Sequence, residues 1–360
     1  MTTDRDIARR RLRTQRLAAP HADSAADVVR GLLAVQAENR GQAGWAVACR
    51  TARPDAAELA ALLDAGEVVR THVLRPTWHF AAAADIGWLL ELTAPRVRPV
   101  VLRQLTDLHG WTTDRLDRAT TLVVDALAAR PDQDRAALAD VLAEGGITAG
   151  GQELMLLLGL LELDRLVCSG RERDGTHTYA RFADRVPASV PRERDDALAE
   201  LALRYFTGHG PATERDLAYW ATLTLTDVRR GLAEVRDRLT SFTHDGRTYW
   251  HAPDAAAPVF APEPQAHLLQ LLDEMYRGYQ DSRMVLDADG LVPRGRESAL
   301  GMALVDGQLV GAMRRTVGAR LRLEVLPYRE LRPGEVAALE EAAARYGRYL
   351  GLEHELVLRA

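Results

Sequence analysis

The chain has 360 residues, of which 47% are hydrophobic and 27% are charged, a balance that suits two to four compact domains. Its formal net charge of −5 argues against a nonspecific nucleic-acid coat, because such proteins are usually basic overall. All 46 basic residues are arginines, so every cation can make planar, bidentate contacts to phosphate or to base edges.

Neither cysteine belongs to a recognisable motif. Cys49 and Cys168 stand alone, which argues against a disulfide framework and against a structural zinc site. The charged stretch from Asp4 to Arg13 does not resemble a signal peptide, and no run approaches the roughly 18 apolar residues of a membrane span. We therefore expect a cytoplasmic protein with no membrane partner, no metal and no cofactor.

Residues 1–115 are expected to form a winged-helix-like domain, in which helices precede a two-stranded hairpin. Apolar residues at helical spacing predict the helices, and Pro95 is expected to end the one that opens at Asp85. The other predicted helices span 4–16, 23–36, 42–51 and 55–65, and the predicted strands span 68–72 and 77–81.

Two further domains, residues 116–190 and 191–262, repeat the order of three helices and a hairpin. Asp174-Gly175 and Asp245-Gly246 stand between strand-like runs, and Asp-Gly is a strong signal for a hairpin turn. This order is typical of the winged helix, which mainly binds nucleic acid. The helix over 151–163 is so apolar that we expect it to be buried, not laid in a groove. The predicted helices span 119–130, 135–143, 151–163, 193–207, 214–221 and 225–238.

Residues 263–360 are expected to form a small α+β unit with a DNA-contacting hairpin. Asp306-Gly307 predicts a turn between its first two strands. The expected fold class is therefore α+β and helix-rich, with tandem winged-helix domains followed by this unit. Its predicted helices span 265–276 and 333–350, and its predicted strands span 299–305, 308–315 and 320–326.

A short polar motif, Gln36-Ala37-Glu38, follows the apolar run Leu32-Leu33-Ala34-Val35. It is expected where the predicted helix 23–36 ends. Packing alone does not explain two polar side chains at this spacing, although both could simply cap the end of a surface helix.

Further polar residues are candidates for DNA contacts, although each could instead be an ordinary surface or structural group. His72 and its neighbours on the first predicted hairpin could contact phosphate or Glu38, or could satisfy local backbone groups. Asp281 could assist the site or pair with Arg283. Arginines on later hairpins could enter a DNA groove, as arginine commonly does. The candidates are His72, Arg75, Thr77, His79, Arg171, Arg173, Asp281, Arg314 and Arg315.

Five segments in this order carry a specific resemblance. They are Gly31–Glu38, Arg70–Phe80, Gly210–Thr213 with Asp216 and Trp220, Asp273-Glu274 with Gly278–Arg283, and Val305–Gly311. Together they resemble the bacterial AlkZ/YcaQ family of winged-helix DNA glycosylases, over nearly the whole chain. The resemblance implies tandem winged helices in a C-shaped arrangement around duplex DNA. It also implies excision of N7-alkylated purines, including bulky adducts and crosslinks, and in some members self-resistance to a DNA-alkylating antibiotic.

The resemblance also assigns the candidate catalytic residues, Gln36 and Glu38. The family motif is Gln-apolar-Gln in one branch and Gln-apolar-Asp in another. Gln36 matches the first position, while Glu38 departs from both branches, with the charge of Asp and the length of Gln. An N7-alkylated purine is a cationic leaving group that needs no general acid. One carboxylate can then stabilise the sugar cation and act as general base, and a neighbouring amide can orient the water.

We therefore expect a monofunctional DNA glycosylase that excises N7-alkylated purines from double-stranded DNA, as a monomer with no obligatory protein partner. Two alternatives stay open at this point. One is a noncatalytic winged-helix DNA-binding regulator, and the other is a protein-interaction scaffold without a nucleic-acid partner. A glycosylase leaves an abasic site in treated DNA, a regulator shifts DNA without this change, and a scaffold does neither.

Overall fold

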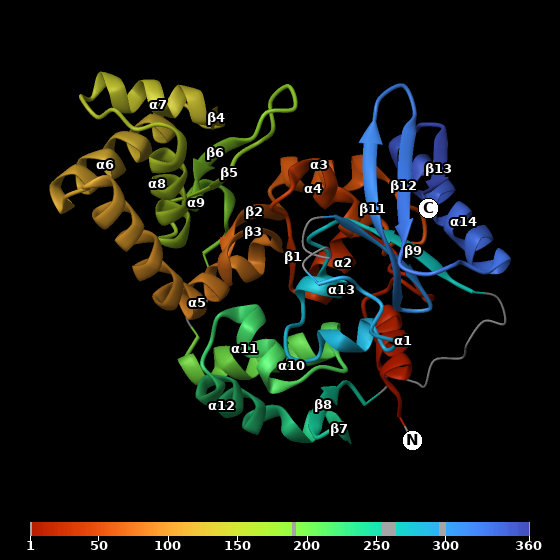
Figure 1. Ribbon diagram of the computed structural model, residues 1–360. Helices are drawn as coiled ribbons and strands as arrows, with labels where there is room; N and C mark the ends of the chain where they lie inside the picture. The colour runs from red at the N-terminus through yellow and green to blue at the C-terminus, as the bar shows by residue number, and fades with distance from the viewer. Residues whose placement is uncertain (1, 189–191, 254–263, 295–299, 360) are drawn as a thin grey trace. The chain divides into compact units, whose positions relative to one another are not determined.

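The computed structural model describes residues 2–188, 192–253, 264–294 and 300–359, which fall into two compact units. Unit 1 combines three stretches of chain, residues 1–59, 199–220 and 224–360. Unit 2 is formed by residues 60–198 with 221–223. The expected mixed α+β, helix-rich class is confirmed (Figure 1). The division into four domains stays a prediction, and its boundaries at 190/191 and 262/263 lie outside the described residues.

The N-terminal part of unit 1 is helical around one short strand. Thr3 caps the first helix by accepting a hydrogen bond from the Asp6 amide, and Ser24 caps the second in the same way from Asp27. The predicted helix over 23–36 is wrong at its end, because the helix stops at Leu32 and a strand follows. The elements are α1 (Asp4–Thr14), α2 (Ala25–Leu32), β1 (Ala34–Gln36), α3 (Arg40–Ala48) and α4 (Ala56–Ala65), which continues into unit 2.

The C-terminal part of unit 1 is a five-stranded sheet in the order β13-β12-β11-β10-β9, with α14 packed on it (Figure 1). All neighbouring strands are antiparallel except β12 and β13. Asp306 and Gly307 turn the β10–β11 hairpin with φ of 50° and 80°, which confirms the predicted turn. The elements are β9 (Ala266–Leu269), α13 (Glu274–Arg277), η3 (Arg283–Leu286), β10 (Gly301–Val305), β11 (Gln308–Val317), β12 (Leu321–Pro327), α14 (Pro333–Leu350) and β13 (His354–Leu358).

Two expectations for this part are corrected. The predicted helix over 265–276 is instead strand β9 and the short helix α13, because Ala266–Leu269 pair with β10 along the sheet edge. Strand β13 was not expected at all. It pairs in parallel with β12, a non-local contact that no turn signal announces.

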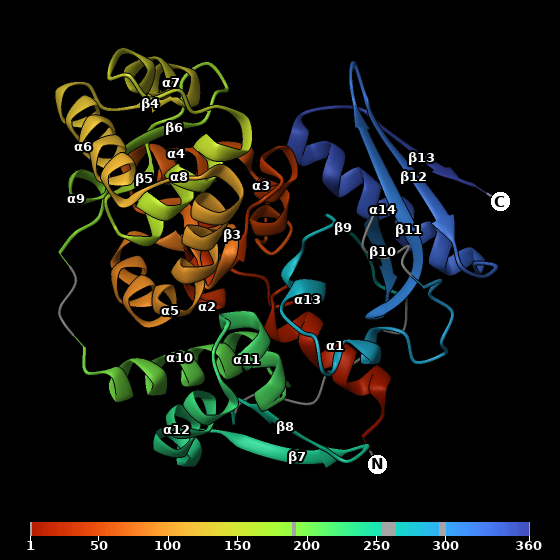
Figure 2. The ribbon, with the colours of Figure 1, turned by 60° about the vertical axis from the view of Figure 1, so that its left-hand side comes forward.

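Residues 194–251 follow the predicted order of three helices and a hairpin, which Figure 2 shows in green. Asp245 and Gly246, with φ of 45° and 69°, turn the hairpin as expected. The elements are α10 (Arg194–His209), α11 (Glu214–Ala221), α12 (Leu225–Val235), η2 (Arg236–Arg238), β7 (Thr240–His244) and β8 (Arg247–His251).

The core of unit 1 joins residues that are far apart in the sequence. Trp45 of α3 stacks on Tyr346 of α14, with ring centroids 4.1 Å apart and planes 8° from parallel. The Trp45 indole N–H also donates to the Leu268 carbonyl in β9 at 2.7 Å. The apolar faces of α1, the sheet and α14 share this core, so the N-terminal helices are held against the C-terminal sheet.

Unit 2 contains an antiparallel hairpin, β2–β3, followed by helices and a three-stranded sheet in the order β4-β6-β5. The predicted stop at Pro95 is wrong, because α5 runs through Pro95 and Pro99 and packs on β2, β3 and α8. This packing outweighs the lost hydrogen bonds. Helix α8 is buried along most of its length, as predicted. The elements are β2 (Val68–Val73), β3 (Arg75–Ala82), α5 (Ala83–Arg103), the π-helix η1 (Gln104–Leu108), α6 (Thr113–Ala129), β4 (Gln133–Asp134), α7 (Arg135–Glu144), α8 (Gly151–Leu163), β5 (Val167–Ser169), β6 (Thr178–Arg181) and α9 (Phe182–Arg185).

In the described parts of the chain, none of the helices combines the length and the apolar character needed to cross a membrane.

The C-terminal end of α10 lies against the backbone of α2, and glycine permits this approach. A Cβ on Gly208 would overlap the carbonyl oxygen of Gly31. We expect Gly208→Ala to lower the free energy of unfolding by about 1–3 kcal/mol, as overpacking does. Urea unfolding followed by circular dichroism measures this change.

Gly31→Ala is the matched control. It lies in α2, where an added Cβ would meet no heavy atom within 4 Å. We expect this variant to be as stable as the wild type or more stable by up to about 1 kcal/mol, because alanine favours a helix. Equal stability of both variants would contradict the proposed close approach.

Candidate functional site

The Gln36-Ala37-Glu38 motif lies where a buried strand leaves the interior of unit 1. Gln36 is the last residue of β1 and only 4% of its surface is exposed. Glu38 lies two residues later in the loop that leads to α3, and it is exposed. The motif thus joins an amide held in the interior to a carboxylate that solvent can reach.

A strained residue turns the chain from α2 into β1. Leu33 has φ of 65° although its side chain is fully buried. Positive φ is rare for a bulky residue and costs on the order of 1–3 kcal/mol. The buried apolar contacts of Leu33 offset this cost, so the direction in which β1 starts is set by packing.

A buried carboxylate holds the motif from behind. The backbone N–H of Gln36 donates to Oε1 of Glu274 at 2.8 Å. The indole N–H of Trp220 donates to Oε2 of Glu274 at 2.9 Å, and Nε2 of His209 lies 3.3 Å from the same oxygen. None of the Glu274 side chain is exposed. Three separate stretches of unit 1 therefore meet at this carboxylate.

The neighbouring residue, Asp273, forms a buried ion pair with Arg50. Both side chains are fully buried, and the two guanidinium N–O distances are 2.7 and 2.9 Å. Arg50 also donates to Oε1 of Gln15 at 2.7 Å, while Asp273 caps α13 by accepting the Met275 amide hydrogen. The helix that carries Glu274 is therefore anchored at its first turn.

A second buried pair, Arg11 and Asp216, organises the segment after α13, with a closest N–O distance of 4.0 Å. Asp216, which caps α11 together with Thr213, accepts the backbone N–H groups of Gln280 and Ser282 at 2.9 and 3.1 Å. Arg11 donates to the Ser282 carbonyl at 3.1 Å, and its guanidinium lies 3.7 Å from the Tyr279 ring centroid. These contacts join α1, α11 and the stretch 278–283.

Two of the predicted DNA contacts lie in the interior of unit 2. Arg75 is 8% exposed and His79 is fully buried. His79 donates from Nδ1 to the Thr77 carbonyl at 2.9 Å, and its Nε2 lies 3.4 Å from Nη2 of Arg75. The Thr77 hydroxyl is buried and has no hydrogen-bond partner in the described structure.

His72 is paired with a carboxylate that the sequence did not single out. Nδ1 of His72 contacts Oε2 of Glu162, and the Trp78 indole N–H donates to that oxygen at 3.0 Å. Burial acts to raise the pKa of Glu162, but the charge and hydrogen bond of His72, with His177 and Trp78, hold this pKa below its ordinary value. The guanidinium of Arg70 stacks 3.8 Å from the Trp78 ring centroid.

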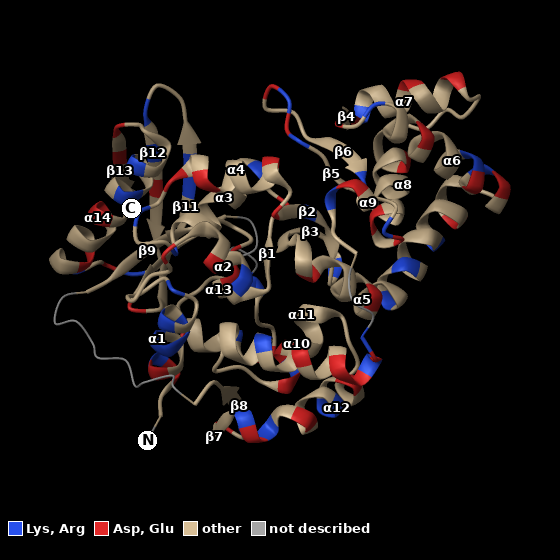
Figure 3. Ribbon diagram, turned by 180° about the vertical axis from the view of Figure 1, so that it is seen from behind, with Lys and Arg blue, Asp and Glu red and all other residues tan. Residues whose placement is uncertain are grey.

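The predicted arginines of the β5–β6 loop are exposed. Arg173 has 60% of its side chain exposed and lies 3.9 Å from Asp132, while Arg171 donates to the Asp64 carbonyl at 3.2 Å. Figure 3 shows that this loop carries acidic as well as basic residues. Its charge is therefore mixed.

Asp281 and the two arginines of β11 differ in their contacts. Asp281 accepts from the Thr213 hydroxyl at 2.9 Å and lies 3.7 Å from Arg247, so the considered pairing with Arg283 is wrong. Arg314 is exposed on β11, where it lies opposite Glu324 of β12. Arg315 donates to the Gly41 carbonyl at 2.7 Å. Gly41 lies in the first turn of α3, directly after the loop that carries Glu38.

Sequence reasoning missed the two carboxylates that organise these clusters, Glu274 and Glu162. Asp273-Glu274 was part of the resemblance but had no role. Glu162 stands among the leucines of α8, and a carboxylate in so apolar a helix needs a partner. That signal could have pointed to Glu162, whereas nothing local in the sequence announces the contact between Glu274 and Gln36.

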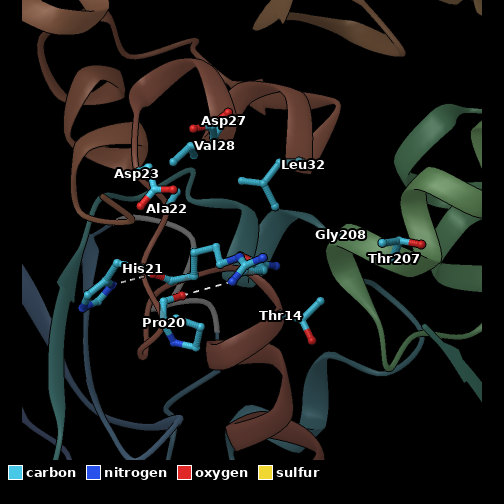
Figure 4. A pocket seen from close by; sticks show the side chains of 13 residues that line it. Thr14, Pro20, His21, Ala22, Asp23, Asp27, Val28, Leu32, Thr207 and Gly208 are labelled. Atoms are coloured by element: carbon cyan, nitrogen blue, oxygen red, sulfur yellow. Dashed lines mark hydrogen bonds between the residues drawn. The ribbon is translucent and has the colours of Figure 1, made fainter. Parts of the chain in front are cut away.

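A cavity of about 440 Å³ lies between the end of α1, α2 and the end of α10, and none of the three motif residues lines it (Figure 4). Gly31 and Leu32, just before β1, line one side, and Thr207 and Gly208 line another. Arg16, Asp23 and Asp27 give its lining charges of both signs. No Phe, Tyr or Trp is among its 13 lining residues, so it offers no large ring on which to stack a base.

The described residues offer neither a reactive cysteine nor a cluster of metal ligands. Burial raises the pKa of the Cys49 and Cys168 thiols to about 12, which keeps them protonated and poor nucleophiles. Among the described residues, no three His, Cys, Asp or Glu side chains are grouped so that they could hold a metal ion.

Comparison with known proteins finds a curated relative and solved structures that resemble this chain. The relative is the interstrand DNA cross-link repair glycosylase of Streptomyces sahachiroi, 27% identical over 351 residues that cover 91% of each chain. One of the structures is Streptomyces sahachiroi DNA glycosylase AlkZ, with a TM-score of 0.76 at 23% identity and 99% coverage of each chain. The structural likeness supports the fold.

The family model for DNA glycosylase AlkZ-like proteins matches residues 29–349, which include the motif, the Glu274 cluster and the β2–β3 hairpin. This match confirms the resemblance inferred from the five sequence segments. The chain belongs to the AlkZ-like DNA glycosylase family and is a DNA glycosylase.

Proposed function

We propose that the protein excises N7-alkylated purines by hydrolysis of the N-glycosidic bond, with Gln36 and Glu38 as the catalytic residues. The observation that carries this proposal is the placement of the motif. An anchored amide at the end of β1 precedes an exposed carboxylate by two residues. This arrangement suits a reaction in which water must be held and deprotonated at the protein surface.

The leaving group explains why so small a set of side chains is sufficient. Alkylation at N7 gives the purine a positive charge, so its departure requires no general acid. Glu38 supplies negative charge for the sugar cation and accepts the proton of the attacking water. Gln36 orients that water by hydrogen bonds without adding a charge.

We extend the proposal to bulky and crosslinked adducts. The curated relative is described as an interstrand DNA cross-link repair glycosylase. The cavity between α1, α2 and α10 offers no large aromatic ring for a flipped base, which suits adducts that stay in the helix. Release of such adducts would protect a cell that makes a DNA-alkylating metabolite from its own product.

We propose that double-stranded DNA is bound by tandem winged helices, in the cytoplasm and by a monomer. The supporting observation is that helices precede a hairpin in α6–β6 and again in α10–β8. Arg171, Arg173 and Arg314 are exposed and are proposed as direct DNA contacts. The β2–β3 hairpin would also take part in DNA binding, through His72, Arg75, Thr77 and His79. Asp281 and Arg315 would support the segments that they contact.

The first test concerns the carboxylate of the motif. We expect Glu38→Ala to slow base release by roughly 10²- to 10⁴-fold, because the general base is lost. Glu38→Gln should slow it less, because it restores the Gln-apolar-Gln form of the motif. Single-turnover release of 7-methylguanine from duplex DNA measures both rates.

Glu353→Ala is the control for this test, since Glu353 is an exposed carboxylate of unit 1 outside the motif. It should release base at the wild-type rate. A Glu38→Ala enzyme as fast as this control would remove Glu38 from the mechanism.

The second test concerns the β11–β12 hairpin. Arg314→Ala should weaken DNA binding and reduce the slope of log affinity against log salt by roughly 0.9, because one phosphate contact is lost. Arg315→Ala should change the slope less, since Arg315 is engaged with the Gly41 carbonyl. Fluorescence anisotropy with a labelled duplex at several salt concentrations gives these slopes.

Arg348→Ala provides the comparison, because Arg348 is exposed on α14 and pairs with Glu341. Its slope should match that of the wild type. Identical slopes for Arg314→Ala and Arg348→Ala would place the hairpin away from DNA.

The third test concerns lesion preference. The enzyme should release N7- and N3-alkylated purines but not uracil or 8-oxoguanine. The neutral bases leave less readily, and each additional barrier of about 1.36 kcal/mol slows the reaction tenfold. Chromatography of bases released from duplexes with single lesions tests the preference. Efficient release of uracil that is lost in Glu38→Ala would point to a base-flipping pocket instead.

A further inference from the structure

The environment of Glu274 is specialised in a way that stability alone does not require. Its two oxygens face different parts of unit 1. Oε1 accepts from the backbone of Gln36, whereas Oε2 faces Trp220 and His209. A buried charge is expensive, and apolar residues of similar volume often give equal or better stability. A carboxylate at this place therefore needs another explanation.

We propose that Glu274 is a positioning residue of the glycosylase reaction, which sets the end of β1 and thereby the placement of Gln36 and Glu38. This inference rests on the proposed catalytic role of the motif. Glu274 does not touch the DNA in this proposal. It acts through the amide of Gln36, which it holds at 2.8 Å.

The carboxylate can hold the motif because it is itself held. Trp220 belongs to α11 and His209 to the last turn of α10, where His209 stacks on Tyr205 with ring planes 11° from parallel. A carboxylate can only accept, so Nε2 of His209 carries the proton that faces it. Asp273, paired with Arg50, fixes the backbone of α13 beside it. Glu274 thus connects the Gln36 backbone to α10 and α11 through its contacts with His209 and Trp220.

Only a group that accepts on both oxygens satisfies this geometry. In Glu274→Gln the side chain accepts at one atom and donates at the other. Either orientation leaves one conflict between two donors, at the Gln36 amide or at the Trp220 indole. The Trp220→Phe change removes the indole donor, and His209 can then turn its unprotonated nitrogen towards the carboxamide. The double variant should restore the hydrogen bond to Gln36.

The test measures single-turnover release of 7-methylguanine, DNA affinity and thermal unfolding for each variant. We expect Glu274→Gln to slow base release by roughly 10- to 100-fold, as small misplacements of catalytic groups do. DNA affinity should stay within about twofold of the wild type, because the charged DNA contacts are unchanged. The double variant Glu274→Gln/Trp220→Phe should be faster than Glu274→Gln alone.

A second readout does not depend on the substrate. Peptide-level hydrogen exchange should become faster over Ala34–Arg40 in Glu274→Gln, since the carboxamide has one accepting atom and the Gln36 amide must compete for it with the Trp220 indole. In the double variant this protection should return. Glu274→Ala should show the same local change if it folds, and the two milder variants carry the test if it does not.

Glu335→Gln is the matched control. Glu335 is also buried in unit 1, but it pairs with Arg329 and Arg332 at the start of α14, away from the motif. This variant should lose thermal stability without a change in the rate of base release or in exchange over Ala34–Arg40. It separates loss of a buried carboxylate in general from loss of the one behind the motif.

The outcomes distinguish this inference from the proposed function. If Glu38→Ala is slow but Glu274→Gln releases base at the wild-type rate and shows unchanged hydrogen exchange, the role of Glu274 is wrong and the proposed function stands. A double variant as slow as the single one would overturn it too. A Glu38→Ala at the wild-type rate would overturn the proposed function, while faster exchange in Glu274→Gln would still support the contact.

Discussion

The fold of unit 1 depends on finding partners for its buried carboxylates, three of which join different stretches of the chain. Asp216, Asp273 and Glu274 are all shielded from solvent, and each is satisfied by a different part of the chain. Arg50 pairs with Asp273, the loop before Ser282 donates to Asp216, and Gln36 donates to Glu274. Removing Arg50 would leave the charge of Asp273 uncompensated, which costs about 3–5 kcal/mol. Unit 1 therefore closes in one arrangement of its three stretches, and the motif is part of that arrangement.

In the proposed mechanism, Glu38 and Glu274 have different roles because they lie in different environments. The first is exposed, so it can exchange a proton with water and meet a charged substrate. The second is sealed in the interior and accepts hydrogen bonds that do not change during a reaction. Catalysis by a preorganised site needs both kinds of group, because an exposed side chain on a loose loop would lose the benefit of its position.

Local signals predicted much of this structure. The three Asp-Gly turns were correct because a turn of this kind depends on two adjacent residues. The end of α2 was predicted wrongly, because Leu32-Leu33-Ala34-Val35 is apolar throughout and such a run suits a buried helix and a buried strand equally. Strand β13 and the contact of Glu274 with Gln36 bring together residues far apart in the chain, and composition and spacing carry no record of them. The motif itself could be found from sequence, but its anchoring could not.

The interruption of unit 1 by unit 2 has a consequence for the order in which the chain folds during synthesis. Unit 2 consists almost entirely of residues 60–198 and can begin to fold once that stretch has left the ribosome. The N-terminal stretch must wait, because Arg11 and Arg50 find their partners only after residue 210 and residue 272 have been made. Until then, the apolar face of α1 and the cations beside it have no native surface to cover them. The nascent chain thus passes through a stage in which the loop that carries the motif is already synthesised, but the residues between 209 and 282 that hold it in place have not yet been made.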